Sequence, residues 1–359
     1  MLSAPLRYGF HPCDHRTLRH PTMNRTGLIL DAERLDDIAD LAAAAERSGF
    51  DSVWATELYR TSFQQLAAAA HSTRTIRLGT AVALAFVRSP LVTALTALDL
   101  DELSGGRLIL GLGSGARRSN ERWHGVPFGS PVAKITECIE AVRLIVSQAH
   151  TGARTRFKGE FYDIDLRGWK RPFYPRRPAI PVFLAGVGPR MTEAAARVAD
   201  GYLGHVVCSF DYLSRVTVPA LARGLERSGR SRSDFTVATI VTCAVSDDVA
   251  AAREAARRTI AFYATVRTYE PPFRLHGFLE QCRAVREAFM RGDVEGMAAA
   301  VTDEMVDAMS VVGTADHCRG VIARYRELVD LPILSAPHYF LDFAEVRRYQ
   351  DAILEAFGL

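Results

Sequence analysis

Two glycine-rich turns in this sequence each follow an apolar run and precede a stretch of helical character. The first is GLGSG at 111–115, and the second is AGVGPRM at 185–191. Glycines let backbone N–H groups approach an anion without obstruction by side chains, and the start of a helix favours negative charge. One such turn can need glycine for backbone reasons alone. Two of them in one chain favour a bound cofactor that carries phosphate.

Titratable side chains follow several of the apolar runs. His11, Glu57 and His205 each stand at or just after the end of such a run, and His338 follows the last one. Imidazole and carboxyl groups can donate or accept protons in general acid–base catalysis. A single histidine in such a place is more often a structural hydrogen bonder, but three of them in equivalent places favour a common pocket. We take His11, Glu57 and His205 as the candidate catalytic residues.

The sequence lacks the motifs that are typical of several other kinds of active site. The turn GLGSGA has no glycine two residues further on, as a Rossmann dinucleotide site requires, and it follows the fourth apolar run instead of the first. The cysteines occur singly and without zinc spacing, and the sequence contains no H-E-x-x-H, G-x-S-x-G or P-loop motif. We therefore expect no metal site, no serine nucleophile and no nucleotide-hydrolysing site.

Eight short, nearly all-apolar runs alternate with amphipathic helical patterns along the chain. Parallel strands that are buried on both faces have this composition. Eight such units predict a closed (β/α)8 barrel, or TIM barrel, in a single domain over 1–359, with the functional residues at the carboxyl ends of the strands. Asp31 is expected to cap the first helix. The predicted strands are 6–13, 50–58, 76–86, 107–113, 180–188, 201–208, 235–245 and 331–337.

Two segments exceed what a plain barrel needs. Residues 150–179, after the fourth helix, are aromatic, basic and rich in proline, and residues 268–312 read as extra helices between the seventh and eighth strands. Long connections of this kind often form the walls of a pocket. We expect both to cover the active site, although the second could equally be peripheral or form a dimer contact. The aromatic residues of 150–179 hint at a planar or anionic substrate.

The composition excludes some partners. A net charge of +3, with scattered lysines and arginines, does not suit nucleic acid, and no run of apolar residues is long enough to span a membrane. The N-terminus lacks the pattern of a secretory signal. Single cysteines fit reduced, mostly buried thiols. We expect a cytoplasmic protein that acts on a small molecule.

Four stretches resemble the bacterial luciferase-like superfamily, and most closely its coenzyme F420-dependent branch, which contains methylenetetrahydromethanopterin reductase. They are GFDSVWATE, IRLGTAVA…RSPLVTALTALDLDELSGGR, RLILGLGSG…SNERWHG and PVFLAGVGPRMTEAAARVADG. The resemblance implies a TIM barrel with F420, a deazaflavin, or FMN at the C-terminal rim, in a homodimer. It also implies a non-proline cis peptide at Ala81 and Val82, behind the cofactor ring. The residues that it assigns to the cofactor are Glu57, Ala81, Val82, Ser114, Gly115, Asn120, Gly186, Val187, Gly188 and Met191.

The sequence departs from the sugar-phosphate dehydrogenase branch of this superfamily at two places. That branch has Asp-His where this chain has Glu57-Leu58, and a glutamate where this chain has Ala116. Without these acid–base groups, oxidation of a sugar is disfavoured, and reduction of an electron-poor C=C or C=N acceptor is favoured. The alternatives are an FMN-dependent monooxygenase that uses reduced flavin and oxygen, and a non-catalytic barrel that binds the cofactor or a partner subunit.

Overall fold

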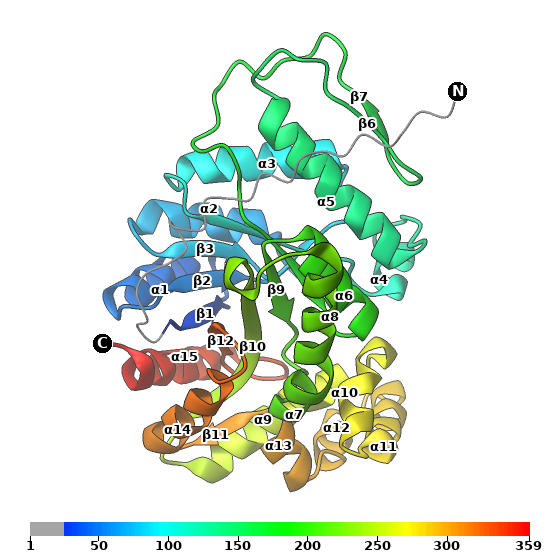
Figure 1. Cartoon of the computed structure of the whole chain (residues 1–359). Coiled ribbons are helices and arrows are strands. Elements are labelled where there is room, and N and C mark those ends of the chain that lie inside the picture. The colour runs from blue at the N-terminus through cyan, green and yellow to red at the C-terminus, as the bar shows by residue number, and fades with distance from the viewer. Residues whose placement is uncertain (1–24) are drawn as a thin grey trace.

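The computed structural model of the chain describes residues 25–359, so His11 and the run 6–13 lie outside the described residues. Eight parallel strands form a closed barrel, because the last strand of the path, β9, also pairs with β10 (Figure 1). The (β/α)8 barrel predicted from the sequence is confirmed. In barrel order its strands are β1 (Gly27–Leu30), β2 (Ser52–Ala55), β3 (Arg77–Thr80), β5 (Leu108–Gly113), β8 (Val182–Gly186), β9 (Gly201–Gly204), β10 (Thr236–Val245) and β12 (Leu331–Ser335).

The first strand differs from the prediction. The barrel closes with β1 at Gly27–Leu30, so the run 6–13 is not one of its eight strands. Asp31 directly follows β1 and does not cap the first helix, α1 (Leu35–Arg47), whose N-cap position is Arg34. The error has a physical cause. A strand of four residues that is buried on both faces shows no alternation of polar and apolar residues, and an aspartate before a helical pattern imitates a cap.

Helices surround the barrel and cover the outward-facing side chains of its strands (Figure 1). The local signals in the sequence explain several of their starts. Ser89 caps α3 by accepting a hydrogen bond from the Val92 N–H at 3.2 Å, and Pro90 occupies the first helical position, as predicted. The surrounding helices are α1, α2 (Ser62–Ser72), α3 (Pro90–Leu103), α5 (Pro131–Gln148), α6 (Pro189–Val198), α8 (Val218–Ser228), α9 (Val249–Ala264), α14 (Ala315–Tyr325) and α15 (Phe343–Phe357).

Alternate strand residues point inward and fill the barrel with a closed apolar plug. At its centre the indole of Trp54 contacts the ring of Phe183 at 5.9 Å between centroids. Gly79 makes room for that indole, since a Cβ there would lie 2.2 Å from it. Side chains fill the interior of such barrels, so a pocket can form only at one end. The plug consists of Ile29, Trp54, Ile109, Phe183, Leu203, Ala238, Leu331 and Ile333.

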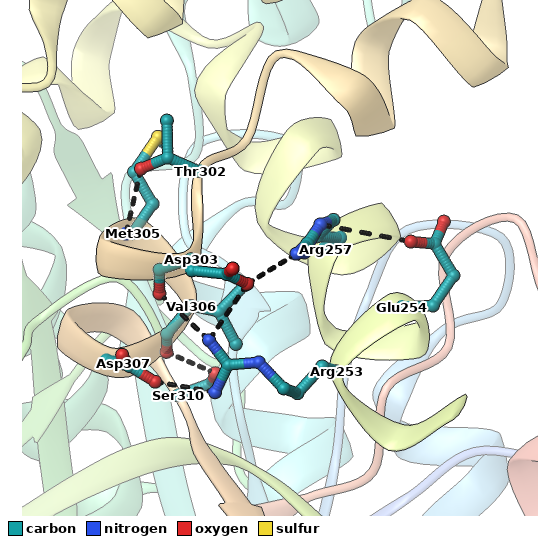
Figure 2. A network of polar contacts seen from close by, with 9 residues as sticks. All are labelled: Arg253, Glu254, Arg257, Thr302, Asp303, Met305, Val306, Asp307 and Ser310. Atoms are coloured by element: carbon teal, nitrogen blue, oxygen red, sulfur yellow. Dashed lines mark hydrogen bonds and ion pairs between the residues drawn. The ribbon is translucent and has the colours of Figure 1, made fainter. Parts of the chain in front are cut away.

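The segment 268–312 forms extra helices, as predicted, and α9 holds them against the barrel. Figure 2 shows that Arg253 of α9 pairs with Asp303 at 3.0 Å and with Asp307 at 2.6 Å, while Arg257 pairs with Asp303 at 2.5 Å. The short strand β11 (Val311–Gly313) then pairs with β10. The extra helices are α10 (Glu270–Leu275), α11 (Leu279–Met290), α12 (Val294–Ala299) and α13 (Asp303–Met309).

The segment 150–179 lies on the outer side of the barrel. Its hairpin of β6 (Arg156–Lys158) and β7 (Asp163–Asp165) is followed by a loop in which Arg177 pairs with Asp101 of α3 at 2.7 Å. The tip between the strands donates backbone hydrogen bonds to Glu137 of α5 at 2.8 Å. In Figure 1 this hairpin and helices α10–α13 lie at opposite ends of the molecule. These contacts give no support to the expectation that 150–179 covers the active site.

Residues 25–359 contain no helix that is long and apolar enough to cross a membrane. Within the same range, no group of three or more histidine, cysteine, aspartate or glutamate side chains is arranged to hold a metal ion. Five of the six cysteines are described, and all five are free thiols in buried positions, which confirms the prediction for these residues.

Glu46 of α1 anchors the connection between α2 and β3. Its carboxylate accepts backbone hydrogen bonds from Arg74 at 2.9 Å and from Thr75 and Ile76 at 2.5 and 2.8 Å. Hydrogen bonds from N–H groups stabilise the ionised form of a carboxyl group. Although burial alone would raise it, the pKa of Glu46 is lowered to about 2 by these backbone hydrogen bonds.

We expect Glu46→Gln to lower the free energy of unfolding by about 1 to 2 kcal/mol at pH 7, after allowance for solvent screening at this partly exposed site. The pKa is lower in the folded than in the unfolded chain, so the stabilisation is present above pH 4.5 and is lost as the pH falls towards 2. Urea unfolding at a series of pH values measures this. Glu355→Gln, at an exposed position of α15, is the matched control, and equal effects of both variants would contradict the account.

Candidate active site at the carboxyl ends of the strands

The first inward-facing layer above the plug defines the mouth of the barrel. Ile29 and Leu203 belong to the plug, so the alternation of the strands turns Asp31 and His205, two residues further on, towards the mouth. Ala81, Val82, Ala185 and Ile240 pack on top of the plug and are partly exposed. The mouth therefore has an apolar floor, with a carboxyl group and an imidazole above it.

The backbone between β3 and β4 (Ala83–Leu84) shapes one side of this floor. A cis peptide bond joins Ala81 and Val82, at the place where the resemblance implies one. Both side chains lie on the plug, and β4 pairs with the end of β5. These two side chains form an apolar surface that suits the face of a flat ring.

Glu57 is positioned differently from Asp31 and His205. Glu57 lies two residues beyond the end of β2 and contacts the loop that carries β4. Its carboxylate accepts a hydrogen bond from the Leu84 N–H at 2.8 Å and two from the guanidinium of Arg88, one of them at 2.9 Å. Both oxygens are thus engaged. This arrangement favours a role in bracing the β4 loop over the catalytic role predicted for Glu57.

The carbonyl groups of the turn after β8 accept hydrogen bonds from other parts of the protein. The hydroxyl of Tyr202 donates to the Gly186 carbonyl at 2.5 Å, and that of Tyr212 donates to the Val187 carbonyl at 3.0 Å. The Gly188 carbonyl accepts from backbone N–H groups in the first turn of α6. The turn leads into the ten-residue helix α6, whose first backbone N–H groups have no carbonyl partner within the helix and suit an anion.

Gly188 leaves room for a ligand at this turn. A Cβ built there would have no atom of residues 25–359 within 4 Å, and its φ of −81° suits any residue. A Cβ at Gly186 would instead meet the side chain of Met191 at 2.9 Å, so Met191 packs beneath the turn. The space beside Gly188 is open, and its place at the start of α6 suits a phosphate group, so we call this open turn the phosphate cradle.

The turn after β5 is braced from within. The side-chain amide of Asn120 donates to the carbonyls of Ser114 at 2.9 Å and Ala116 at 3.0 Å, while Asn120 itself is fully buried. Gly115 takes a positive φ of 64°, and a Cβ there would lie 3.0 Å from Leu84. Asn120 therefore holds the turn against the β4 loop. Contact of these residues with a cofactor stays a prediction.

An aromatic cluster forms the wall of the mouth opposite β3 and β5. His205 stacks on Tyr269 at 4.2 Å and meets Tyr263 edge-on at 5.2 Å, and Tyr263 in turn meets Tyr339 at 5.3 Å. Tyr263 lies in the last turn of α9, Tyr269 precedes α10, and Tyr339 follows β12. Tyr263 and Tyr269 were not predicted as site residues, because their part of the sequence shows only the pattern of a long helix followed by an insertion. The segment 268–312 thus reaches the mouth through Tyr269.

His205 is held as a neutral imidazole. Burial lowers its pKa to about 4. The backbone N–H of Val207 donates to Nδ1 at 3.4 Å, which leaves the proton on Nε2. His205 can therefore donate a hydrogen bond into the mouth at neutral pH, but it does not carry a positive charge there.

Asp31 lies beside His338 on the wall formed by β1 and β12. Burial raises the pKa of Asp31, and electrostatic interactions with His338 and Arg60 oppose that shift. Nδ1 of His338 lies 3.1 Å from the Ala336 carbonyl, which can only accept, so this nitrogen carries a proton. Asp31 was predicted as a helix cap and not as a residue of the site. The signal that could have found it is the run GLIL before it, read as a short strand.

Comparisons with known proteins agree with this fold and site. A family model described as luciferase-like monooxygenase matches residues 16–331. An uncharacterized protein of Mycobacterium tuberculosis is 40% identical over 305 residues, which cover 83% of this chain and 90% of that protein. The 5,10-methylenetetrahydromethanopterin reductase of Archaeoglobus fulgidus is 36% identical over 293 residues, which cover 79% of this chain and 83% of that enzyme.

Among solved structures, the coenzyme F420-dependent tetrahydromethanopterin reductase from Methanopyrus kandleri has a TM-score of 0.77 at 24% identity, with 93% of this chain and 99% of that chain covered. The chain belongs to the luciferase-like monooxygenase family. It is an enzyme of the oxidoreductase class that this family comprises. The resemblance given by the four sequence stretches is thereby confirmed.

We expect His205→Gln to change how stability depends on pH. The folded pKa of about 4 lies below the ordinary 6.5, so the unfolded chain binds the proton more readily between these values. The wild type should therefore lose about 1.4 kcal/mol per pH unit relative to the variant as the pH falls through this range. Urea unfolding between pH 7 and 4 measures the difference. Parallel curves, or the same change in the exposed control His124→Gln, would show that His205 is not buried in neutral form.

Proposed function

We propose that this protein is an F420-dependent oxidoreductase that transfers a hydride between the reduced deazaflavin and a small organic substrate with a C=C or C=N bond. The observation that carries the proposal is the cradle at Gly188, above an apolar floor that suits a ring. The name of the reductase from Archaeoglobus fulgidus supports the reaction class, and that of the protein from Methanopyrus kandleri refers to F420. The buried thiols fit the cytoplasmic location, and the resemblance implies a homodimer.

Each part of the mouth has a distinct task in this proposal. Gly186, Val187 and Gly188 offer backbone N–H groups to the phosphate, and Ala81 and Val82 support one face of the ring. When bound, reduced F420 supplies the hydride. The chain contributes mainly by holding donor and acceptor in the reacting geometry and by excluding water. A catalytic role for His11 remains part of the proposal, although His11 lies outside the described residues.

A second candidate is an FMN-dependent monooxygenase. The description of the matching family model, a luciferase-like monooxygenase, favours it. The same cradle and floor would suit FMN, which also has a flat ring and a phosphate. The two candidates differ in the cofactor, because the deazaflavin has carbon in place of the flavin nitrogen N5 and does not form the oxygen adduct of reduced flavin.

Titration of F420 and of FMN, each followed by fluorescence, tests the proposal. We expect F420 to bind more tightly than FMN, and Gly188→Ala to weaken F420 binding by about tenfold or more, equivalent to about 1.4 kcal/mol. The reason is that the new methyl group would occupy the space for the phosphate, while the folded chain meets it with no clash. Gly320→Ala, at an exposed glycine of α14 that is equally free of neighbours among residues 25–359, is the matched control.

The control should bind F420 as the wild type does, and both variants should unfold at or above the wild-type temperature. Tight binding of FMN without any response to F420 would replace the first candidate by the second. Unchanged F420 binding in Gly188→Ala would show that the phosphate lies elsewhere.

A further inference from the structure

A continuous series of aromatic rings runs along one side of the mouth. His205, next to the plug, belongs to the aromatic cluster described above, and Tyr339 at the other end of that cluster stacks on Phe262 at 3.5 Å between centroids. The ring of Phe262 in turn meets Phe340 edge-on at 6.3 Å. Each ring thus contacts the next. We call the whole series the aromatic band, which consists of Tyr269, His205, Tyr263, Tyr339, Phe262 and Phe340.

The outer end of the aromatic band is exposed. Phe340, after β12, is 41% exposed, and it is the one residue other than glycine among 25–359 that has a positive φ, at 61°. A bulky side chain rarely adopts this conformation, which persists only where other contacts enforce it. Burial raises the pKa of Tyr339, and Tyr59, which follows β2 and is 85% exposed, lies near enough to add to the shift. A contiguous exposed apolar surface of this kind marks a site of interaction.

The aromatic band differs in charge from other rings of the protein. Within residues 25–359, no lysine or arginine side chain lies over a ring of the band. By contrast, Nζ of Lys134 lies 4.5 Å from the ring centre of Phe86, and the guanidinium of Arg117 lies 4.8 Å from that of Phe128. A cation over a ring adds attraction for a negatively charged ligand. The rings of the band therefore offer apolar faces and edges without such a charge.

A carboxyl group lies beside the aromatic band. Burial raises the pKa values of Tyr263 and Tyr339, and the nearby charge of Asp31 adds to both shifts. Arg60 and His338 interact electrostatically with Asp31 itself, so their charges are opposed by its carboxylate. Like charges that are brought together at a binding surface cost free energy. An uncharged ligand therefore suits this wall of the mouth better than an anion.

The rings of the band are held by one another before any ligand arrives. Aromatic rings attract other planar rings through their faces and edges. Because the side chains of the band are already ordered, a ligand loses little free energy in fixing them. A rigid wall of this kind favours a flat molecule that covers several of its rings at once.

We propose that the substrate of this site is an uncharged, extended planar molecule, whose ring system lies along the aromatic band while its C=C or C=N bond meets the cofactor. The inference rests on the proposed function and names its substrate class. Phe340 would contact the far end of such a molecule, so it is a specificity-determining residue that favours long substrates over short ones. The aromatic residues of 150–179, which hinted at a planar or anionic substrate, are not part of the band.

Calorimetric titration tests the substrate class without turnover. The probes are enones that carry a methyl, phenyl or naphthyl group, and a phenyl enone with a carboxylate on its ring. Each is added to the protein with oxidised F420, which has no hydride to give. The affinity should rise about tenfold from methyl to phenyl and about tenfold again to naphthyl. The carboxylate should bind about tenfold more weakly than the plain phenyl enone. Equal affinities for the uncharged probes, or tighter binding of the carboxylate, would overturn the proposal.

The variant Phe340→Ala separates the aromatic band from nonspecific binding of apolar probes. With reduced F420, the ratio of KM for the methyl enone to KM for the naphthyl enone should fall about tenfold, because the ring at the outer end is lost. Phe340→Tyr keeps a ring there and should keep the wild-type ratio. Phe289→Ala is the matched control, since Phe289 of α11 is 49% exposed and contacts no other ring among residues 25–359.

The outcomes distinguish this proposal from the proposed function. An unchanged ratio in Phe340→Ala, or an equal fall in Phe289→Ala, would overturn the role of the aromatic band. Absence of F420 binding, or of turnover of every probe by the wild type, would instead refute the proposed function itself.

Discussion

The contact between Trp54 and Phe183 inside the barrel determines where chemistry can take place. These two rings fill the interior only because Gly79 and Gly201 leave room for them, and a Cβ at Gly201 would lie 2.6 Å from Phe183. The plug closes the barrel below, so ligands can enter only from the carboxyl ends of the strands. The plug also shows which alternate residues of each strand point into the barrel. Because Ile29 and Leu203 belong to the plug, the alternation of the strands turns Asp31 and His205 towards the mouth, whereas the carboxylate of Glu57 is held by Arg88 and the Leu84 N–H.

The mouth that results has two unlike walls. On the side of β3, β5 and β8 the wall is formed mainly by the backbone. It consists of the cis peptide with its apolar side chains and of two glycine turns, the second of which has its carbonyl groups bonded to tyrosine hydroxyls. On the side of β9, β10, β12 and β1 the wall is formed by side chains, namely an aromatic cluster around His205 and the half-buried carboxyl group of Asp31. The extra helices matter because they bring Tyr269 to this second wall, and α9 fixes them there through its arginines (Figure 2).

Much of the fold could be predicted from the sequence, because its signals are local. Buried strands such as RLILGLG and caps such as Ser89-Pro90 depend on a few neighbouring residues, and the helices within 268–312 were predicted in the same way. The site was harder. Which residues of a strand point into the barrel cannot be read from a short run that is apolar throughout, so the place of Asp31 after GLIL was not predicted, and the ion pair of Glu57 with Arg88 joins residues 31 positions apart. The aromatic wall joins Tyr263, Tyr269 and Tyr339 from distant parts of the chain, and the hairpin of 150–179 packs on α3 and α5 through contacts that no local pattern encodes.

A crystal structure of the protein with F420 bound tests the central claim most directly, namely that one wall of the mouth holds the cofactor and the other serves the substrate. The account predicts the phosphate at Gly188 and the start of α6, the ring on Ala81 and Val82, and a free space between the ring and the wall that carries Asp31 and His205. A phosphate bound away from the turn after β8, or a ring that covers Asp31 and leaves no room for a substrate, would contradict it.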